Sequence, residues 1–295
     1  MYESYNSTDA TQNIISSITN NSLEIPKSTL INWSNEAKEK LMPEIEHIEH
    51  EILNSYYAHF DESQIKVDGE TFNEVCASTK KHTRMWTLKS KKHEELEKIN
   101  VFNSFMGVII KDGTDLYNGF GTAFSQCISH IQRYLKGIYD YINHKGPKKM
   151  AEYLTKYNDY RKELIEKGIA KFGEDELKKI FSEYDEIIKL WKKEWMSDEN
   201  NPQYDEERKL LSRMEDSDKE QILYFLKDFK VPSTNNQVET DQRNIKIKQK
   251  IGKFRSDGGA EIYAIIRSCI NTYKKQGINV YHALIKSFSG ETIIA

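Results

Sequence analysis

The sequence predicts an α/β protein with a large helical insertion, and three stretches of the chain support this prediction. Residues 56–111 contain aromatic and alternating segments that favour strands. Residues 148–229 are highly charged and helix-like, without a strand signal. Residues 260–288 have the apolar spacing of two amphipathic helices, and Gly277 ends the first. A helical block inserted into a sheet domain is the simplest account of this order.

Length, charge and cysteine content restrict the class of protein. A chain of 295 residues with 30% charged and 38% apolar residues fits a soluble, helix-rich protein, in one large domain or two smaller ones. No apolar run approaches the roughly 18–20 residues that a membrane span needs, and no signal pattern opens the chain, so a cytoplasmic location is expected. Cys76, Cys127 and Cys269 are far apart and form no CxxC pair, which argues against a disulfide framework or a cysteine zinc site.

The N-terminal part predicts a polar segment followed by linker helices. Residues 1–22 are rich in Ser, Thr and Asn and predict a poorly ordered segment. Ser28 is a candidate cap for a first short helix, and Pro43 suits the first turn of a second. The apolar positions recur at helical spacing: Leu30, Trp33, Ala37, Leu41, Ile45, Ile48 and Ile52.

The sheet region predicts three strands, a short helix and a fourth strand. In the first strand, Tyr57, His59 and Asp61 share one face, and Phe60 lies on the other. FNEVCAST and RMWTLK read as the next two strands, KHEELEKINVF as the helix, and MGVIIKDG as a buried strand that ends at Asp112.

One long helix is expected after this strand, from an apolar stripe that runs from Phe124 to Ile142. Gly146 and Pro147 are predicted to end it, and the charged helical insertion follows. In the last segment, Asn279 is expected to cap the final helix.

Residues 231–256 stand out because a lone acid precedes a run of cations. VPSTNNQ predicts a turn, and Asn235 and Asn236 favour the start of a helix that carries Glu239. The following stretch QRNIKIKQKIGKFR has six cations and no acid, against a formal net charge of −3 for the chain. The cations are either a solvated helix face or a phosphate-binding strip, and we favour phosphate binding because it releases counterions.

Asp61, Asp112 and Glu239 are candidate metal ligands, since two lie at predicted strands and the third on a helix able to pack across them. Oxygen ligands that converge suit Mg²⁺ or Mn²⁺. Two such ions can clamp a phosphodiester. The spacing alone is a weak signal, because the chain has 46 acids and most acids are exposed. Glu62 is the obvious competitor for Asp61.

Four segments resemble blocks of the insertion-sequence-66 family of bacterial DDE transposases. AHFDESQIKVDG resembles H-A-D-E-T-x-x-R-V-x-G, and VIIKDGTDLY resembles V-H-D-x-W-x-x-Y. CISHIQRYLK resembles C-N-A-H-L-x-R-E-L-K. Residues 231–284 resemble the C-terminal block nearly throughout, including N-N-x-x-E-x-x-x-R and K-x-K-Q-K. The matches span roughly residues 26–290. Family members are typically longer, so the resemblance implies the catalytic domain of an N-terminally truncated member.

The resemblance implies a ribonuclease-H-like mixed sheet with a helical insertion and flanking helices. It implies Asp61, Asp112 and Glu239 as the metal-binding catalytic triad, with two Mg²⁺ or Mn²⁺ ions. It places Cys127 and His130 near the DNA. The expected layout is a polar N-terminus with linker helices (1–55), a catalytic core (56–147 and 219–256), a helical insertion (148–218) and C-terminal helices (257–295).

The implied function is metal-dependent strand cleavage and strand transfer at transposon ends. The implied partners are double-stranded DNA, at the nucleoid, and further copies of the chain. The expected DNA-binding residues are His130, Arg133, Asn236, Arg243, Lys246, Lys248, Lys250, Lys253 and Arg255. Two alternatives stay open: an inactive remnant that only binds DNA, and a helical interaction protein built on residues 148–229.

Overall fold

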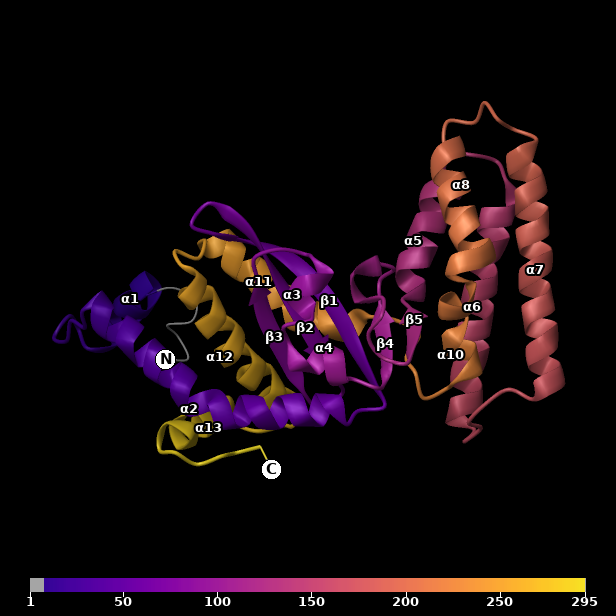
Figure 1. The fold of residues 1–295 in the computed structure, drawn as a ribbon. Coiled ribbons are helices and arrows are strands. Elements are labelled where there is room, and N and C mark those ends of the chain that lie inside the picture. The colour runs from indigo at the N-terminus through magenta and orange to yellow at the C-terminus, as the bar shows by residue number, and fades with distance from the viewer. Residues whose placement is uncertain (1–7, 295) are drawn as a thin grey trace. The chain divides into compact units, whose positions relative to one another are not determined.

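A computed structural model of the protein describes residues 8–294, which divide into two compact units. Unit 1 contains residues 8–107, 115–121 and 236–294, and unit 2 contains residues 108–114 and 122–235. Figure 1 follows the chain through both by colour. No helix among the described residues has the length and apolar character needed to span a membrane.

Unit 1 begins with two helices, α1 (Thr8–Ile18) and α2 (Lys27–Leu53). The prediction of a poorly ordered segment is therefore wrong for α1, whereas residues 1–7 lie outside the described part. The predicted division of α2 is also wrong, because α2 runs unbroken through Pro43 and starts after Pro26, without a side-chain cap from Ser28. A proline inside a helix removes one backbone hydrogen bond. The apolar stripe that stays buried on both sides of Pro43 offsets that cost: Leu30, Ala37, Leu41, Ile45, Ile48 and Ile52.

Three antiparallel strands form the sheet of unit 1, as the alternating sequence predicts: β1 (Tyr57–Val67), β2 (Glu70–Ser78) and β3 (Thr83–Leu88). Asp61 of β1 lies opposite Cys76 of β2. Asp68 and Gly69 join β1 to β2 with φ of 46° and 85°. A two-residue turn with positive φ at both positions matches the right-handed twist of the strands.

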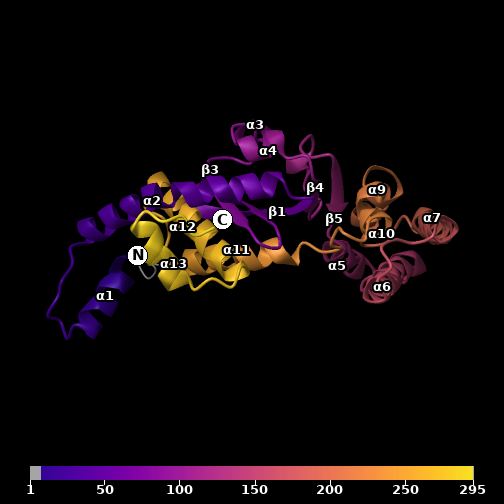
Figure 2. The ribbon, with the colours of Figure 1, turned by 90° about the horizontal axis from the view of Figure 1, so that it is seen from below.

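The two faces of this sheet are covered by different helices, seen from below in Figure 2. On one face lie α11 (Asn236–Ile251) and α12 (Asp257–Lys275), whose Val238 and Ala264 pack on the buried Cys76 and Met85. On the other lie α3 (His93–Leu96), α4 (Asn100–Ser104) and the 3₁₀ helix η1 (Asp115–Tyr117). There the ring of Phe60 lies 5.6 Å from that of Tyr117. The alternation of β1 therefore directs Asp61 and Phe60 to opposite faces, as predicted.

The end of unit 1 also follows the sequence signals. Gly277, with φ of 71°, follows α12, and the side chain of Asn279 accepts a hydrogen bond from the His282 N–H to cap α13 (Val280–Phe288). Lys38 of α2 forms an ion pair with Glu261 of α12 at 2.8 Å.

Unit 2 combines a parallel strand pair with a helical bundle. Its strands are β4 (Val108–Lys111) and β5 (Ala123–Gln126). The large buried rings of Tyr153, Tyr184 and Trp191 lie in the core of the bundle. The helices, visible together in Figure 1, are α5 (Ile128–Tyr139), α6 (Lys145–Glu166), α7 (Glu174–Met196), α8 (Tyr204–Ser212), the π-helical turn η2 (Arg213–Ser217), α9 (Lys219–Ile222) and α10 (Tyr224–Lys227).

Two predictions in unit 2 are wrong. Phe124 belongs to β5, opposite Ile109 of β4, so the long predicted helix is a short strand followed by α5. Gly146 and Pro147 lie in the first turn of α6 and do not end a helix. A Cβ added to Gly146 would come within 2.2 Å of the Trp191 Cβ, so glycine is needed for close packing. With five described strands in antiparallel and parallel pairs, the chain is a mixed α/β protein.

Candidate metal and DNA-binding site

In unit 1, Asp61 lies half-buried on β1, on the face that α11 covers. Gln242 of α11 joins the two elements. Its Nε2 donates to the Asp61 carbonyl at 2.9 Å, and its Oε1 accepts from the Ser63 hydroxyl at 3.0 Å. The competing acid, Glu62, points to the opposite face, where its carboxylate accepts from Tyr117 Oη at 2.9 Å and from Lys91 Nζ at 3.1 Å. The two neighbouring acids are therefore in different environments, and only Asp61 faces α11.

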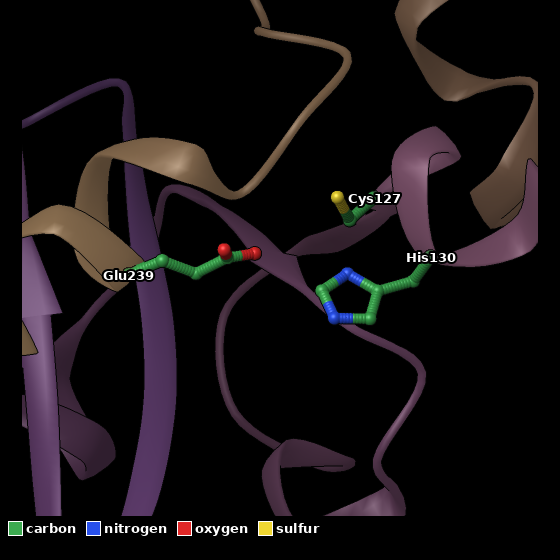
Figure 3. A group of neighbouring side chains, drawn as sticks. All are labelled: Cys127, His130 and Glu239. Carbon is green, nitrogen blue, oxygen red and sulfur yellow. The ribbon is translucent and has the colours of Figure 1, made fainter. Parts of the chain in front are cut away.

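Glu239 lies half-buried in the first turn of α11, as the sequence predicts (Figure 3). An acid is favourable there because the backbone N–H groups at a helix start carry partial positive charge. Gln242 follows Glu239 by three residues, so the two side chains occupy neighbouring positions along the helix. The same hydrogen bonds that fix Gln242 to β1 thus hold the segment that carries Glu239 beside the strand that carries Asp61.

A buried ion pair fixes the same helix to the sheet. Asp241 is only 8% exposed, and its Oδ2 accepts from Lys275 Nζ at 2.6 Å, from the Ser78 hydroxyl at 2.7 Å and from the Thr83 hydroxyl at 2.9 Å. Burial lowers the pKa of Lys275, and Asp241 opposes that change by favouring the charged ammonium. Because α11, α12, β2 and β3 all contribute, these contacts limit rotation of α11 about its axis.

In unit 2, Asp112 directly follows β4 and is half-buried. Gly113 comes next with φ of 96°, a conformation that glycine adopts without strain. The buried Lys111 stabilises this turn. Its Nζ donates to the Thr114 carbonyl at 2.9 Å and lies 4.6 Å from the centre of the Phe124 ring. The turn presents Asp112 at the end of the strand, as predicted.

Cys127 and His130 lie at the start of α5 (Figure 3). The buried Cys127 Sγ accepts from the Asn235 N–H at 3.1 Å. Burial raises the pKa of Cys127, but hydrogen bonds from the His130 side chain and from the backbone of Asn235 and His130 outweigh it, so the pKa is lowered overall. The hydrogen bond with Cys127 raises the pKa of His130, burial opposes it, and the charges of Cys127 and Asp112 add to the increase. Unit 2 therefore brings Asp112, Cys127 and His130 into one electrostatic environment.

Asn235 binds Cys127 and directly precedes α11 in the chain. Asn235 is fully buried, and Ser233 nearby accepts from the Ile128 N–H at 3.0 Å, so the 233–235 turn is fixed to the start of α5. Asn236 is the exposed first residue of α11. The Asn235–Asn236 turn therefore starts the helix that carries Glu239, as predicted.

The cations after Glu239 are mostly exposed, with one exception. Lys248 is 8% exposed, its Nζ donates to the Gly252 carbonyl at 2.9 Å, and burial lowers its pKa. Its ammonium thus binds the carboxyl end of α11. The other predicted cations of this run face solvent: Arg243, Lys246, Lys250, Lys253 and Arg255. Arg133, predicted on α5, is also exposed.

Three residues that position the site were missed from the sequence: Gln242, Asp241 and Lys275. Gln242 could have been found, since it follows Glu239 at helical spacing and its side chain can bind a strand backbone. The Asp241–Lys275 pair offers no such signal, because its partners are 34 residues apart on different helices.

The model of the transposase IS66 family matches residues 1–262 of the chain. No curated protein matches the chain. A transposase family implies DNA binding and enzyme chemistry of the nuclease or transferase type, generally dependent on divalent metal. The match confirms the family resemblance seen in the sequence, and the chain belongs to the transposase IS66 family.

Proposed function

We propose that the chain is a DDE transposase catalytic domain of ribonuclease-H type that cleaves and joins DNA strands at transposon ends. Family membership supports the reaction class. The observation that carries the site is the binding of Gln242 to β1, which holds the elements of Asp61 and Glu239 together in unit 1. The antiparallel β1–β3 sheet and the parallel β4–β5 pair support the fold type.

In this proposal Asp61, Asp112 and Glu239 are the metal ligands. Their chemistry fits, because each offers carboxylate oxygens from a half-buried position, and Mg²⁺ and Mn²⁺ prefer oxygen ligands. Two such ions, when bound, activate the attacking oxygen and stabilise the leaving one. Water first hydrolyses the phosphodiester at the transposon end, which leaves a 3′-OH on the element and a 5′-phosphate on the flanking strand. The freed 3′-OH then attacks a phosphodiester of the target strand and displaces the 3′-oxygen of the target.

The protein residues around these acids bind and orient the DNA. We assign phosphate binding to the exposed cations of α11 and of the loop after it, together with His130, Arg133 and Asn236. Lys248 is left out of this set, because its ammonium is buried against the Gly252 carbonyl. In this proposal the Asp241–Lys275 pair contacts neither DNA nor metal and only holds α11 in its position on the sheet.

Strand cleavage by the purified chain tests the proposal. The substrate is an end-labelled duplex taken from the termini of the mobile element that carries the gene, incubated with Mg²⁺ or Mn²⁺. We expect metal-dependent nicking in the wild type and its loss in Asp61→Asn and in Glu239→Gln. Glu62→Gln is the matched control, since it removes the neighbouring carboxylate, which points to the opposite face. Nicking that persists in both site variants would overturn the proposal.

A second, non-catalytic function predicts a different result in the same assay. A chain that only binds DNA would show salt-sensitive duplex binding and no cutting at any metal concentration. The exposed cations of α11 favour binding in either case. Titration of Mn²⁺ into wild type and Asp61→Asn separates the two functions, because only the catalytic site predicts weaker metal binding in the variant.

A further inference from the structure

A cavity of about 770 Å³ in unit 2 lies between α5 and α8. Most of its charged lining is positive: Arg133, Arg208, Lys209 and Arg213, against Glu206 alone among acids. Concave surfaces that gather one sign of charge concentrate ions of the opposite sign. The lining therefore points to an anionic ligand.

Arg213 lines this cavity and also lies against Gly113, the residue after Asp112. It begins the π-helical turn η2, and single π turns often occur at functional sites. Its Nε donates to Asp218 Oδ2 at 2.7 Å, which fixes the plane of the guanidinium. A Cβ built on Gly113 would lie 2.6 Å from Arg213 Nη2. The guanidinium thus packs directly on the turn that follows Asp112.

The Nη2 atom of Arg213 is buried and has no hydrogen-bond acceptor among the residues that the structure describes. A buried donor without an acceptor costs about 1–3 kcal/mol, and more where the group is charged. A shift of this flexible side chain toward the cavity would let a phosphate oxygen accept from it, because the planar guanidinium matches phosphate geometry. The orphaned donor is the second observation, independent of the cavity, that points to an anion.

Arg133 differs from the other cations of the lining. Arg208 and Lys209 pair with acids three residues earlier, at 3.6 and 2.8 Å, whereas Arg133 makes no ion pair within residues 8–294. Arg133 also lines a second cavity of about 710 Å³ between α5 and α6. The cations of that cavity are Arg133, Lys136, Lys148 and Lys156. Arg133 therefore lines both cavities.

We propose that the α5–α8 cavity is a phosphate subsite of the helical unit, in which Arg133 and Arg213 bind the DNA backbone beside the Asp112 turn. The inference rests on the proposed function and extends it, since it assigns DNA contacts to α8 and η2 as well as to α5 and α11. Arg213 binds a phosphate through Nη2 while Asp218 holds its Nε. Arg133 adds a second contact from the opposite wall.

Duplex binding without metal tests this subsite. The probe is a fluorescent duplex of about 30 base pairs, with chelator present, and binding is followed by anisotropy across a range of salt. Each phosphate contact contributes about 0.9 to the slope of log K against log salt. We expect Arg133→Ala to lower the magnitude of the slope by about 1 and to weaken binding several-fold at every salt concentration. Arg213→Lys keeps the charge but loses the planar guanidinium with its paired N–H donors, so we expect weaker binding with little change in slope.

Lys178→Ala is the control, because it removes an exposed positive charge from α7 of the same unit, outside both cavity linings. Thermal unfolding confirms that each variant is folded. Wild-type slope and affinity in both Arg133→Ala and Arg213→Lys would overturn the subsite, and so would a chain that binds no duplex. If such a chain still cuts DNA, the proposed function stands. If the variants lose binding but no chain cuts DNA, the subsite stands and the catalytic proposal fails.

Discussion

The two units each bury a carboxylate, and they stabilise it in different ways. In unit 1, Asp241 is paired with a cation, Lys275, and with two hydroxyl groups. In unit 2, the fully buried Glu207 accepts from Trp191 Nε1 at 2.6 Å and contacts His144 Nδ1 at 2.8 Å, with no lysine or arginine partner among the side chains that the structure describes. The lysine–carboxylate pair of unit 1 therefore lies two residues from the candidate ligand Glu239, whereas the buried acid of the bundle is held by ring and amide nitrogens.

The buried carboxylate of unit 1 holds a helix in position, whereas the buried carboxylate of unit 2 holds the helices of the bundle together. Asp241 connects four elements of unit 1 around α11, so its contacts determine where Glu239 lies. Glu207 joins α8 to Trp191 and to the start of α6, and so closes the bundle. Mutations of the two groups should therefore have separable effects.

The largest effect is expected from Lys275→Met, which leaves Asp241 buried without its cation. Removing one partner of a buried pair costs about 3–5 kcal/mol. We expect a loss of that size in the free energy of unfolding, measured with denaturant. Amide hydrogen exchange should rise in α11, α12 and β3 while the bundle stays protected. The control is Lys156→Met, which breaks an exposed pair with Glu183 and should cost less than about 1 kcal/mol.

A third buried acid, Glu74 in unit 1, should make the free energy of unfolding depend on pH. Burial raises the pKa of Glu74 in unit 1 to about 8; the Thr87 hydroxyl and Arg84 oppose the increase. The folded state then holds a proton that the unfolded state releases near pH 4.5, so stability falls as pH rises from about 4.5 to 8. We expect a loss of about 2 kcal/mol between pH 5 and pH 7 that is absent in Glu74→Gln, measured by denaturant unfolding. An equal slope in the variant would contradict the assignment.

Glu207→Gln tests the buried acid of the bundle. Gln keeps one acceptor for the Trp191 indole but removes the charge, so the hydrogen bonds weaken from the charged to the neutral range. We expect a loss of about 1–2 kcal/mol, with faster hydrogen exchange confined to α6–α8. Glu206→Gln, at an exposed neighbouring position, is the control. Faster exchange in α11 would show that the two buried acids do not act separately.

The smallest effect is expected at a helix end that involves no buried charge. The Ser256 hydroxyl accepts from the Gly259 N–H at 3.1 Å and caps α12. Ser256→Ala should cost about 1 kcal/mol, the usual value of such a cap. Ser256→Thr keeps the hydroxyl and should restore most of it. A cost near that of Lys275→Met would mean that the cap, rather than the ion pair, anchors α12.

Local patterns predicted much of this molecule. β1–β4, α11, α12 and α13 follow from alternation, helical spacing and caps. β5 was missed because its four residues, from Ala123 to Gln126, continue the apolar spacing of α5. α2 was divided in error because Pro43 is a strong local signal, whereas the burial that carries the helix past it comes from distant packing.

The site shows the same limit. Asp61, Asp112 and Glu239 were singled out, and the parity of β1 separates Asp61 from Glu62. Lys248 looks like its neighbours in the sequence, yet it is buried, because one face of α11 packs against the sheet. Which charged side chain of a helix is buried depends on packing partners that are distant in the sequence. The local spacing of residues does not identify those partners.

The order of the chain has a consequence for synthesis. Residues of β3 bind side chains of α12 that follow them by more than 180 positions: the Thr83 N–H donates to Thr272 Oγ1, and the Met85 N–H donates to Ser268 Oγ. On the ribosome the helical bundle is therefore synthesised before α11 and α12, the helices that cover one face of the sheet of unit 1. Contacts of such long range form slowly. We expect nascent chains that stop before α11 to carry a folded bundle and an unfinished sheet, and hence to need protection from aggregation until the helix that carries Glu239 has emerged.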